Sequence, residues 1–224
     1  MLTSASFVIG SSWQLKQLSV DERDFLDRAP FVLVCNRFPE HWRKVGFRPT
    51  LWAMGDTDGP EGCAVLKEQL TAIRQDSELR ERLRHLWVCC ESPQAHSIVA
   101  ECELPVTLYR RGNWTHRDQQ LATIPDETIY HFGSTLTNLV NLALILNPGR
   151  EVRITGCQHG RRCGHFYDDG QESVHALTTF GYVVQRMWQA FADLQRRGTR
   201  IVDCNFEHEE LPGEFRLPRR GLLE

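Results

Sequence analysis

An α/β fold with one open, mostly parallel sheet is predicted by three features of the sequence. Short apolar segments that resemble strands alternate with longer amphipathic segments that resemble helices along nearly the whole chain, as in parallel sheets covered by helices. Residues 31–35 form a continuous apolar run, which is expected of a central strand covered on both faces. The chain of 224 residues is long enough for one large domain with a substantial core.

The predicted strands and helices follow each other in a regular order. A helix is predicted to start at the capping box of Ser19 and Glu22, and a short one to start at Pro39 and end at Gly46. The predicted strands cover residues 6–9, 31–35, 51–54, 86–90, 106–109, 152–155 and 199–204. The other predicted helical regions cover residues 63–83, 93–101 and 171–197, and residues 110–128 are predicted to be an irregular surface excursion.

The segment of residues 136–146 is apolar nearly all round at helical spacing, and this predicts a buried helix. Ser134 or Thr135 is a natural N-cap, and Gly133 precedes them. The free N–H groups and the positive end of the dipole at such a helix start can bind a phosphate or a carboxylate. An ordinary capped core helix explains the same residues.

Composition excludes several classes of partner. The chain has 26 basic and 29 acidic residues, so its charge does not indicate a nucleic-acid partner. Its first residues lack the basic region of a signal peptide, and no uncharged apolar run reaches the length of a membrane span. The eight scattered cysteines contain no CxxC pair and are expected to be reduced, buried thiols. We therefore expect a soluble cytoplasmic protein.

Small and polar residues follow most of the predicted strands. In open parallel sheets, ligands bind beyond the carboxyl ends of the strands, so these residues are expected to meet at one rim. Their glycine, hydroxyl, amide and carboxylate groups are those that hold the base, ribose and phosphate of a nucleotide. Ordinary turns use the same residue types. The residues are Gly10, Ser11, Ser12, Asn36, Asp56, Gly133, Ser134, Thr135, Gly156, Cys157, Gln158 and His159.

Several of these segments resemble one known group of enzymes. Residues 10–15 (GSSWQL) are similar to a GNGPSL-type loop, and residues 35–38 (CNRF) to a signature whose Asn contacts the nucleotide. A strand that leads to Asp56, the block of residues 133–156 and the HFYD run at 165–168 follow in the same order. Together they resemble the bacterial sialyltransferases of glycosyltransferase family 42 and the related DUF115 (MptE-like) Rossmann proteins.

The resemblance implies a single Rossmann-like, nucleotide-sugar-binding domain at residues 1–207, with a short lid at about residues 157–174. Residues 208–224 would be a loosely held tail. The implied activity is metal-independent transfer of a sugar from a donor activated with cytidine monophosphate (CMP) to an acceptor hydroxyl, with a histidine as general base. A glycan or a small molecule would be the acceptor. Peripheral membrane association and homo-oligomers stay open.

The resemblance also implies roles for individual residues. His175 is the best positional match for the general base and His165 the second, while Tyr167 lies where the family's lid tyrosines stabilise the leaving phosphate. The implied nucleotide-binding residues are Gly10, Ser11, Ser12, Asn36, Asp56, Gly133, Ser134, Thr135, Gly156 and His159. Two other functions stay open: a magnesium-dependent phosphoryl transferase of the diphosphokinase kind, and a non-catalytic nucleotide-binding module.

Two groups of residues are alternative metal sites. Asp56 and Asp58 have the DxD form, whose carboxylate oxygens suit magnesium or manganese, although a turn explains them equally well. Cys157, His159, Cys163 and His165 provide four zinc-type ligands within nine residues, but their spacing is not that of a usual zinc finger. The nearby Arg161 and Arg162 fit phosphate binding at least as well.

Overall fold

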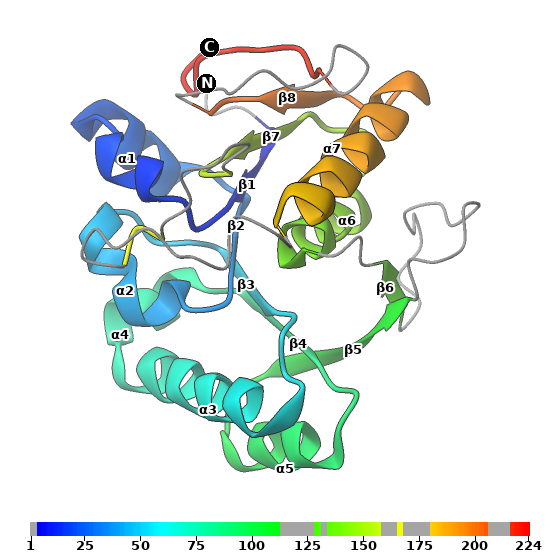
Figure 1. Cartoon of the computed structure of the whole chain (residues 1–224). Coiled ribbons are helices and arrows are strands. Elements are labelled where there is room, and N and C mark those ends of the chain that lie inside the picture. The colour runs from blue at the N-terminus through cyan, green and yellow to red at the C-terminus, as the bar shows by residue number, and fades with distance from the viewer. Residues whose placement is uncertain (1–3, 113–127, 131–133, 158–164, 168–179, 206–215) are drawn as a thin grey trace.

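The computed structural model contains one sheet of eight parallel strands in the order β6-β5-β4-β3-β2-β1-β7-β8 (Figure 1). It describes residues 4–112, 128–130, 134–157, 165–167, 180–205 and 216–224. The predicted α/β class with a Rossmann-like parallel sheet is confirmed. The strands are β1 Ser6–Ile9, β2 Val32–Cys35, β3 Leu51–Met54, β4 His85–Cys89, β5 Val106–Gly112, β6 Thr128–Tyr130, β7 Val152–Thr155 and β8 Ile201–Asp203.

The order of the strands reverses next to β1. The chain adds β2, β3, β4, β5 and β6 successively outward on one side of β1, and then returns to place β7 on its other side. In the register, Phe7 lies opposite Val32 of β2 and opposite Arg153 of β7. Loops that leave β1 and β7 therefore diverge at this point, and such a switch point is where open α/β sheets form a ligand-binding crevice.

Helices cover both faces of the sheet (Figure 1). The short 3₁₀ helix η1 follows β1, and then α1 to α5 cover one face while α6 and α7 cover the other. Successive residues of β1 point to opposite faces, so Phe7 and Ile9 contact the first group and Val8 the second. The helices are η1 Trp13–Gln17, α1 Val20–Arg28, α2 Phe38–Val45, α3 Gly59–Gln75, α4 Ser77–Arg82, α5 Pro93–Glu101, α6 Thr135–Leu146 and α7 Phe180–Arg196.

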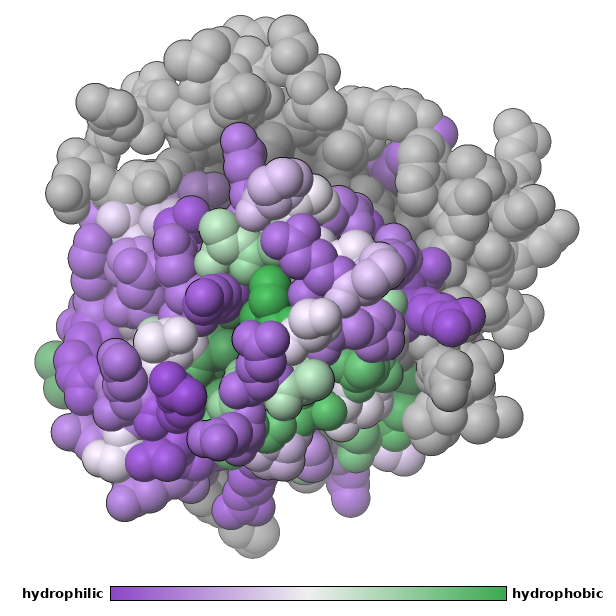
Figure 2. Space-filling model, turned by 90° about the horizontal axis from the view of Figure 1, so that it is seen from below, coloured by the Kyte–Doolittle hydropathy of each residue, from purple (hydrophilic) through white to green (hydrophobic). Residues whose placement is uncertain are grey.

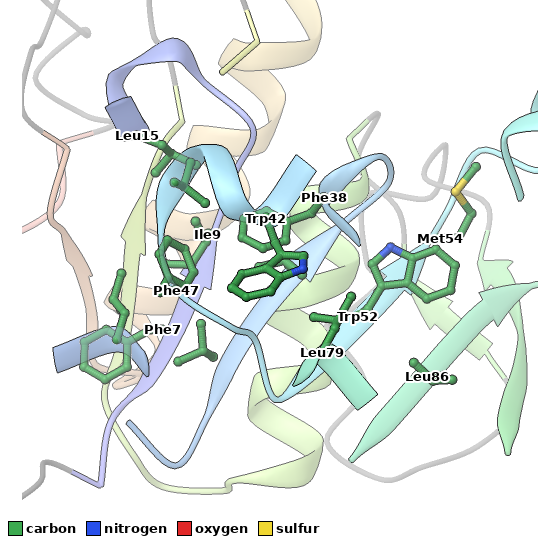
Figure 3. Packing of buried hydrophobic residues seen from close by; sticks show 14 of the residues in the cluster. Phe7, Ile9, Leu15, Phe38, Trp42, Phe47, Trp52, Met54, Leu79 and Leu86 are labelled. Carbon is green, nitrogen blue, oxygen red and sulfur yellow. The ribbon is translucent and has the colours of Figure 1, made fainter. Parts of the chain in front are cut away.

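The core beneath α2 combines aromatic packing with satisfied polar groups (Figure 3). Phe38 packs on Phe47 with 5.3 Å between ring centroids, and both side chains are fully buried. The indole of Trp52 donates to the backbone oxygen of Asn36 at 2.8 Å, and that of Trp42 to Asp76 at 2.9 Å. Buried indoles usually find such an acceptor; the first bond links β3 to the end of β2, and the second links α2 to the junction of α3 and α4.

Helix α6 confirms the prediction of a buried, capped helix. Its residues 135–143 are all buried, and Ser134 is the N-cap, whose hydroxyl accepts a hydrogen bond from the N–H of Leu136 at 3.2 Å. Thr135 is therefore the first residue of the helix, while Gly133 lies outside the described residues.

Other parts differ from the predicted elements. A 3₁₀ helix follows β1, β5 extends to Gly112, and Asp76 divides the charged amphipathic region into α3 and α4. Strand β6 begins at the end of the segment predicted to be irregular, because its backbone pairs with β5. Helix α7 begins at Phe180, and residues 171–179 of the longer predicted helix lie outside the described part.

The last residues of the chain pack more firmly than the loosely held tail that the sequence predicted. Leu217 and Leu222 are buried, and the N–H of Asp203 donates to the backbone oxygen of Pro218 at 2.8 Å. The buried guanidinium of Arg153 donates to the backbone oxygen of Leu222 at 3.0 Å. Residues 216–224 thus lie along β8, held by backbone hydrogen bonds and by two apolar side chains.

Hydrophilic side chains prevail on the face below α3 and α5, with hydrophobic ones visible between them (Figure 2). The C-terminal halves of α3 and α5 line a groove of about 240 Å³ there, away from the carboxyl ends of the strands. Among the helices that the structure describes, none combines the length and the apolar content needed to cross a membrane.

Candidate functional site

The predicted rim of polar groups forms at the carboxyl ends of the strands. Its first part, called here the neutral part of the rim, contains Gly10, Ser11, Ser12, Gly156 and His165. The N–H of Gly10 donates to the backbone oxygen of Thr155 at 2.8 Å, and the N–H of Ser12 to that of Gly156 at 2.9 Å. A Cβ on Gly10 would overlap the backbone oxygen of Gly156, so glycine is needed for this close approach.

His165 lies directly against the loop that follows β1. Its Nδ1 and the hydroxyl of Ser11 are 2.8 Å apart in a hydrogen bond, and the next residue, Phe166, donates its N–H to the backbone oxygen of Ser11 at 2.9 Å. Ser12 and His165 also form an antiparallel bridge. The ring of Tyr167 stacks on that of His165 with 4.7 Å between centroids and 13° between planes. The structure therefore brings His165 and Tyr167 to the predicted phosphate loop.

Asn36 occupies the centre of the rim, at the end of β2. Its φ angle is +51°, a left-handed conformation that Asn tolerates better than most residues. Its side-chain amide donates to Oδ2 of Asp56 at 3.3 Å. The other amide atom, Oδ1, is buried and has no hydrogen-bond partner among the described residues. An orphaned buried acceptor is uncommon, so Oδ1 of Asn36 can accept a hydrogen bond from a group that the described part of the chain does not supply.

The start of α6 also meets Asp56. Thr135 donates its hydroxyl to Oδ2 of Asp56 at 3.3 Å, and a Cβ on Gly55 would lie 2.6 Å from the Thr135 hydroxyl oxygen. The carboxylate near the positive end of this helix is therefore one that the chain supplies itself. An added phosphate at Ser134 and Thr135 would meet this negative charge.

The other end of the rim, called here the charged part, is built around Arg111. Its guanidinium pairs with Asp58, lies 3.2 Å from Glu91 and 3.8 Å from Asp56. Burial acts to lower the pKa of Arg111, but hydrogen bonds to Glu91 and Asp58 outweigh it and raise the pKa above its usual value. The Arg111 side chain is 17% exposed, whereas Asp56 and Asp58 are about 60% exposed. The mostly buried guanidinium of Arg111 thus forms ion pairs with three carboxylates.

Neither predicted metal site has a complete set of ligands among the described residues. Asp56 and Asp58 both face Arg111, and in the described ranges no group of three or more His, Cys, Asp or Glu side chains is arranged to hold an ion. Of the zinc-type residues, Cys157 is buried with its N–H donating to Asn205 at 2.8 Å. His159 and Cys163 lie outside the described part.

Two thiols near the rim are poor nucleophiles. Burial, together with the charge of Asp56, raises the pKa of Cys35 to about 12. Burial and the charge of Glu91 raise the pKa of Cys89 to about 12, with Arg111 opposing. Because the thiolate is the reactive form, we assign these cysteines a packing role, as the sequence predicted.

The structure brings together most of the residues predicted for the site. Those at the ends of β1, β2, β3 and β7 and at the start of α6 share one rim with His165 and Tyr167. His175, His159 and Gly133 lie outside the described residues. Sequence reasoning missed Arg111 and Glu91 because the strand ends considered for the rim did not include those of residues 86–90 and 106–109. The signal was available, since Glu91 directly follows a predicted strand and Arg111 follows another by two residues.

Comparisons with known proteins do not assign this chain to a family. A scan against protein-family models finds no match, and a search of curated proteins finds none.

Proposed function

We propose that the chain is a glycosyltransferase that transfers a sugar from a CMP-activated donor to an acceptor hydroxyl, with the nucleotide bound along the rim. The proposal rests on a rim whose polar groups divide by charge: neutral donors at β1 and β7, and carboxylates at β3 and β4. A nucleotide has the complementary division, with an anionic phosphate at one end and N–H and O–H donors at the other. The identity of the sugar and the cytidine base comes from the motif resemblance.

The observation that carries the proposal is the orphaned Oδ1 of Asn36. A buried acceptor without a partner costs about 1–3 kcal/mol, and a ligand that supplies an N–H or O–H recovers that energy. Asp56 next to it can accept from a ribose hydroxyl, as acidic residues do in nucleotide-binding α/β folds. An amino group or hydroxyls of a nucleoside therefore suit this pair.

The phosphate is expected at the neutral part of the rim and away from the start of α6. Asp56 near Thr135 would repel a second anion there. The hydroxyl of Ser11 bonds with Nδ1 of His165, and the hydroxyl of Ser12 accepts from the N–H of Gln14 at 3.3 Å. These two hydroxyls, aimed at the phosphate, would stabilise the charge that develops on it when the sugar departs.

The reaction needs one proton acceptor. The acceptor hydroxyl oxygen attacks the anomeric carbon of the donor, a new C–O bond forms, and the bond between that carbon and the phosphate oxygen breaks. The electron pair of the broken bond leaves with CMP, and the hydroxyl proton passes to a histidine. His165 is the described candidate for this role, and His175 is the candidate that the motif resemblance favours.

A panel of nucleotides tests the proposal directly. Thermal stability of the wild-type chain is measured with CMP, CDP, UDP, GDP and ATP, each with magnesium or with EDTA. A ligand at a hundredfold excess over its dissociation constant adds about 2.7 kcal/mol to stability. We expect a shift with CMP that persists in EDTA and is reduced in Asn36→Gly. A shift only with ATP or a diphosphate plus magnesium would instead favour phosphoryl transfer, and no shift with any nucleotide would contradict the proposal.

A further inference from the structure

Two histidines from distant parts of the chain stack on the same tyrosine, Tyr167. The ring of His41 in α2 stacks on Tyr167 with 4.9 Å between centroids and 23° between planes. The ring of His165 also stacks on Tyr167, at 4.7 Å and 13°. The three rings are nearly parallel, and we call them the ring stack. Stacked aromatic pairs add about 0.5–1.5 kcal/mol each beyond the area that they bury.

Helix α2 provides the platform for this arrangement. Phe38, His41 and Lys44 are spaced by three residues and so lie along one side of the helix. Phe38 packs on the fully buried Phe166 with 5.4 Å between centroids. Lys44 donates its ammonium to the backbone oxygen of Tyr167 at 2.9 Å. Three separate contacts from α2 thus hold two consecutive residues that follow His165.

The result is that the ring of His165 is constrained in two independent ways. The stack with Tyr167 fixes the plane of the imidazole, and the hydrogen bond of Nδ1 with the Ser11 hydroxyl at 2.8 Å fixes its rotation within that plane. A plane and one in-plane direction together determine where Nε2 points. Such fixed orientation is what a general base needs, because proton transfer requires hydrogen-bond geometry first.

We propose that His41 is a positioning residue, which acts through Tyr167 to orient His165. Its side chain is about 20% exposed, and Glu40 lies 3.6 Å from its Nε2. Removing the imidazole therefore leaves the fold of α2 intact, because Phe38 and Trp42 remain to anchor the helix in the core. The catalytic consequence rests on the proposed function, whereas the orientation of His165 does not.

The test compares two substitutions of His41 with a control. His41→Leu removes the flat ring, His41→Phe keeps a ring that can stack, and His96→Leu removes an exposed imidazole from α5. The primary readout is the NMR spectrum of the His165 ring, assigned by its disappearance in His165→Ala. The ring-current shift from Tyr167 and the ¹⁵N shift of Nδ1 report the stack and the bond with Ser11.

We expect His41→Leu to lose the ring-current shift and to change the Nδ1 signal, and His41→Phe to retain both. His96→Leu should match the wild type. Turnover should fall by about tenfold to a hundredfold in His41→Leu, as for a slightly misplaced catalytic group, and recover in His41→Phe. If His41→Leu fails to fold, the pair Tyr167→Leu and Tyr167→Phe makes the same comparison at the centre of the stack.

The outcomes separate this inference from the proposed function. Unchanged His165 signals in a folded His41→Leu variant would overturn the positioning role, whatever the chain catalyses. Equal loss in His41→Leu and His41→Phe would overturn it as well, because stacking would then not be the cause. Altered signals that the phenylalanine restores, in a chain that binds no nucleotide, would establish the positioning role and reject the proposed function.

Discussion

The two parts of the rim are built by different kinds of interaction. In the neutral part, backbone hydrogen bonds, a backbone-to-backbone contact at Gly10 and the ring stack hold the residues. In the charged part, the side chain of Arg111 gathers three carboxylates, of which Asp56 and Asp58 are largely exposed. Backbone contacts are short and rigid, whereas exposed ion pairs are weak and respond to salt.

Under the proposed function, this difference would give the two parts of the rim different roles in binding the donor. The rigid part lies at the switch point between β1 and β7, where the proposed phosphate and general base would need fixed geometry. The charged part can rearrange at little energetic expense, which suits contacts to variable groups on a donor or an acceptor. Asn36, at the end of β2, lies between the two parts in the strand order and bonds to Asp56 of the charged part.

The largest expected effect on stability comes from adding a methyl group to a glycine in each part of the rim. Gly10→Ala places a methyl group against the backbone of Gly156, whereas Gly55→Ala places one against the side chain of Thr135. We expect a loss of about 3–5 kcal/mol for the first, because backbone must move, and about 1–2 kcal/mol for the second. Denaturant unfolding measures both.

Gly149→Ala is the control for these two variants. Its φ is +72° and no atom lies near the added methyl group, so only the left-handed conformation costs energy, about 1 kcal/mol. A Gly10→Ala chain no less stable than Gly149→Ala would contradict a rigid backbone contact at the switch point.

The second prediction concerns Asn36, which lies between the neutral and the charged part of the rim. Asn36→Gly keeps the left-handed backbone without strain but removes the orphaned acceptor. We expect nucleotide affinity to fall about tenfold to a hundredfold, which corresponds to about 1–3 kcal/mol, while stability without ligand changes little. Isothermal titration measures the affinity, and an unchanged dissociation constant would exclude Asn36 from the site.

The third prediction tests the charged part. Arg111→Met leaves Asp56, Asp58 and Glu91 near each other without a cation. We expect stability to fall by about 1–2 kcal/mol at low salt, with much of the loss recovered at 1 M salt, where exposed charges are screened. The neutral variant Ser11→Ala should show no such salt dependence. Equal salt responses of the two variants would remove the distinction between the parts.

The smallest effect is expected from the thiol at the end of β4. The pKa of Cys89 is raised to about 12 in the folded chain, whereas an unfolded thiol titrates near 9. Because the pKa of this thiol is higher in the folded chain than in the unfolded chain, its contribution to stability is complete below pH 9. This contribution is lost as the pH rises towards 12. At pH 10, the destabilisation caused by Cys89→Ala, measured against the wild type at the same pH, should therefore be about 1 kcal/mol smaller than at pH 8. Unfolding curves at the two pH values provide the comparison.

The sequence predicted the elements whose signals are local. Continuous apolar runs identified the central strands, and Ser134 before an all-apolar run identified the start of α6. The shared rim was predictable because carboxyl ends of parallel strands meet at one edge. The pairing of Arg111 with Asp58 was not predictable, because it joins the end of one strand to the loop after another. The contact of His41 with Tyr167 depends likewise on how α2 packs, and no local pattern encodes it.

The return of the chain from β6 to β7 also has a consequence for the order of folding. Strands β1 to β5 pair with sequence neighbours, so that half of the sheet can form from nearby segments as synthesis proceeds. The pairing of β1 with β7, and the bond of Ser11 with His165 across 154 positions, close the longest loops and must come later. The face that awaits α6 and α7 is therefore exposed in the nascent chain. A chaperone that covers this face would protect the half-built sheet until α6 and α7 pack on it.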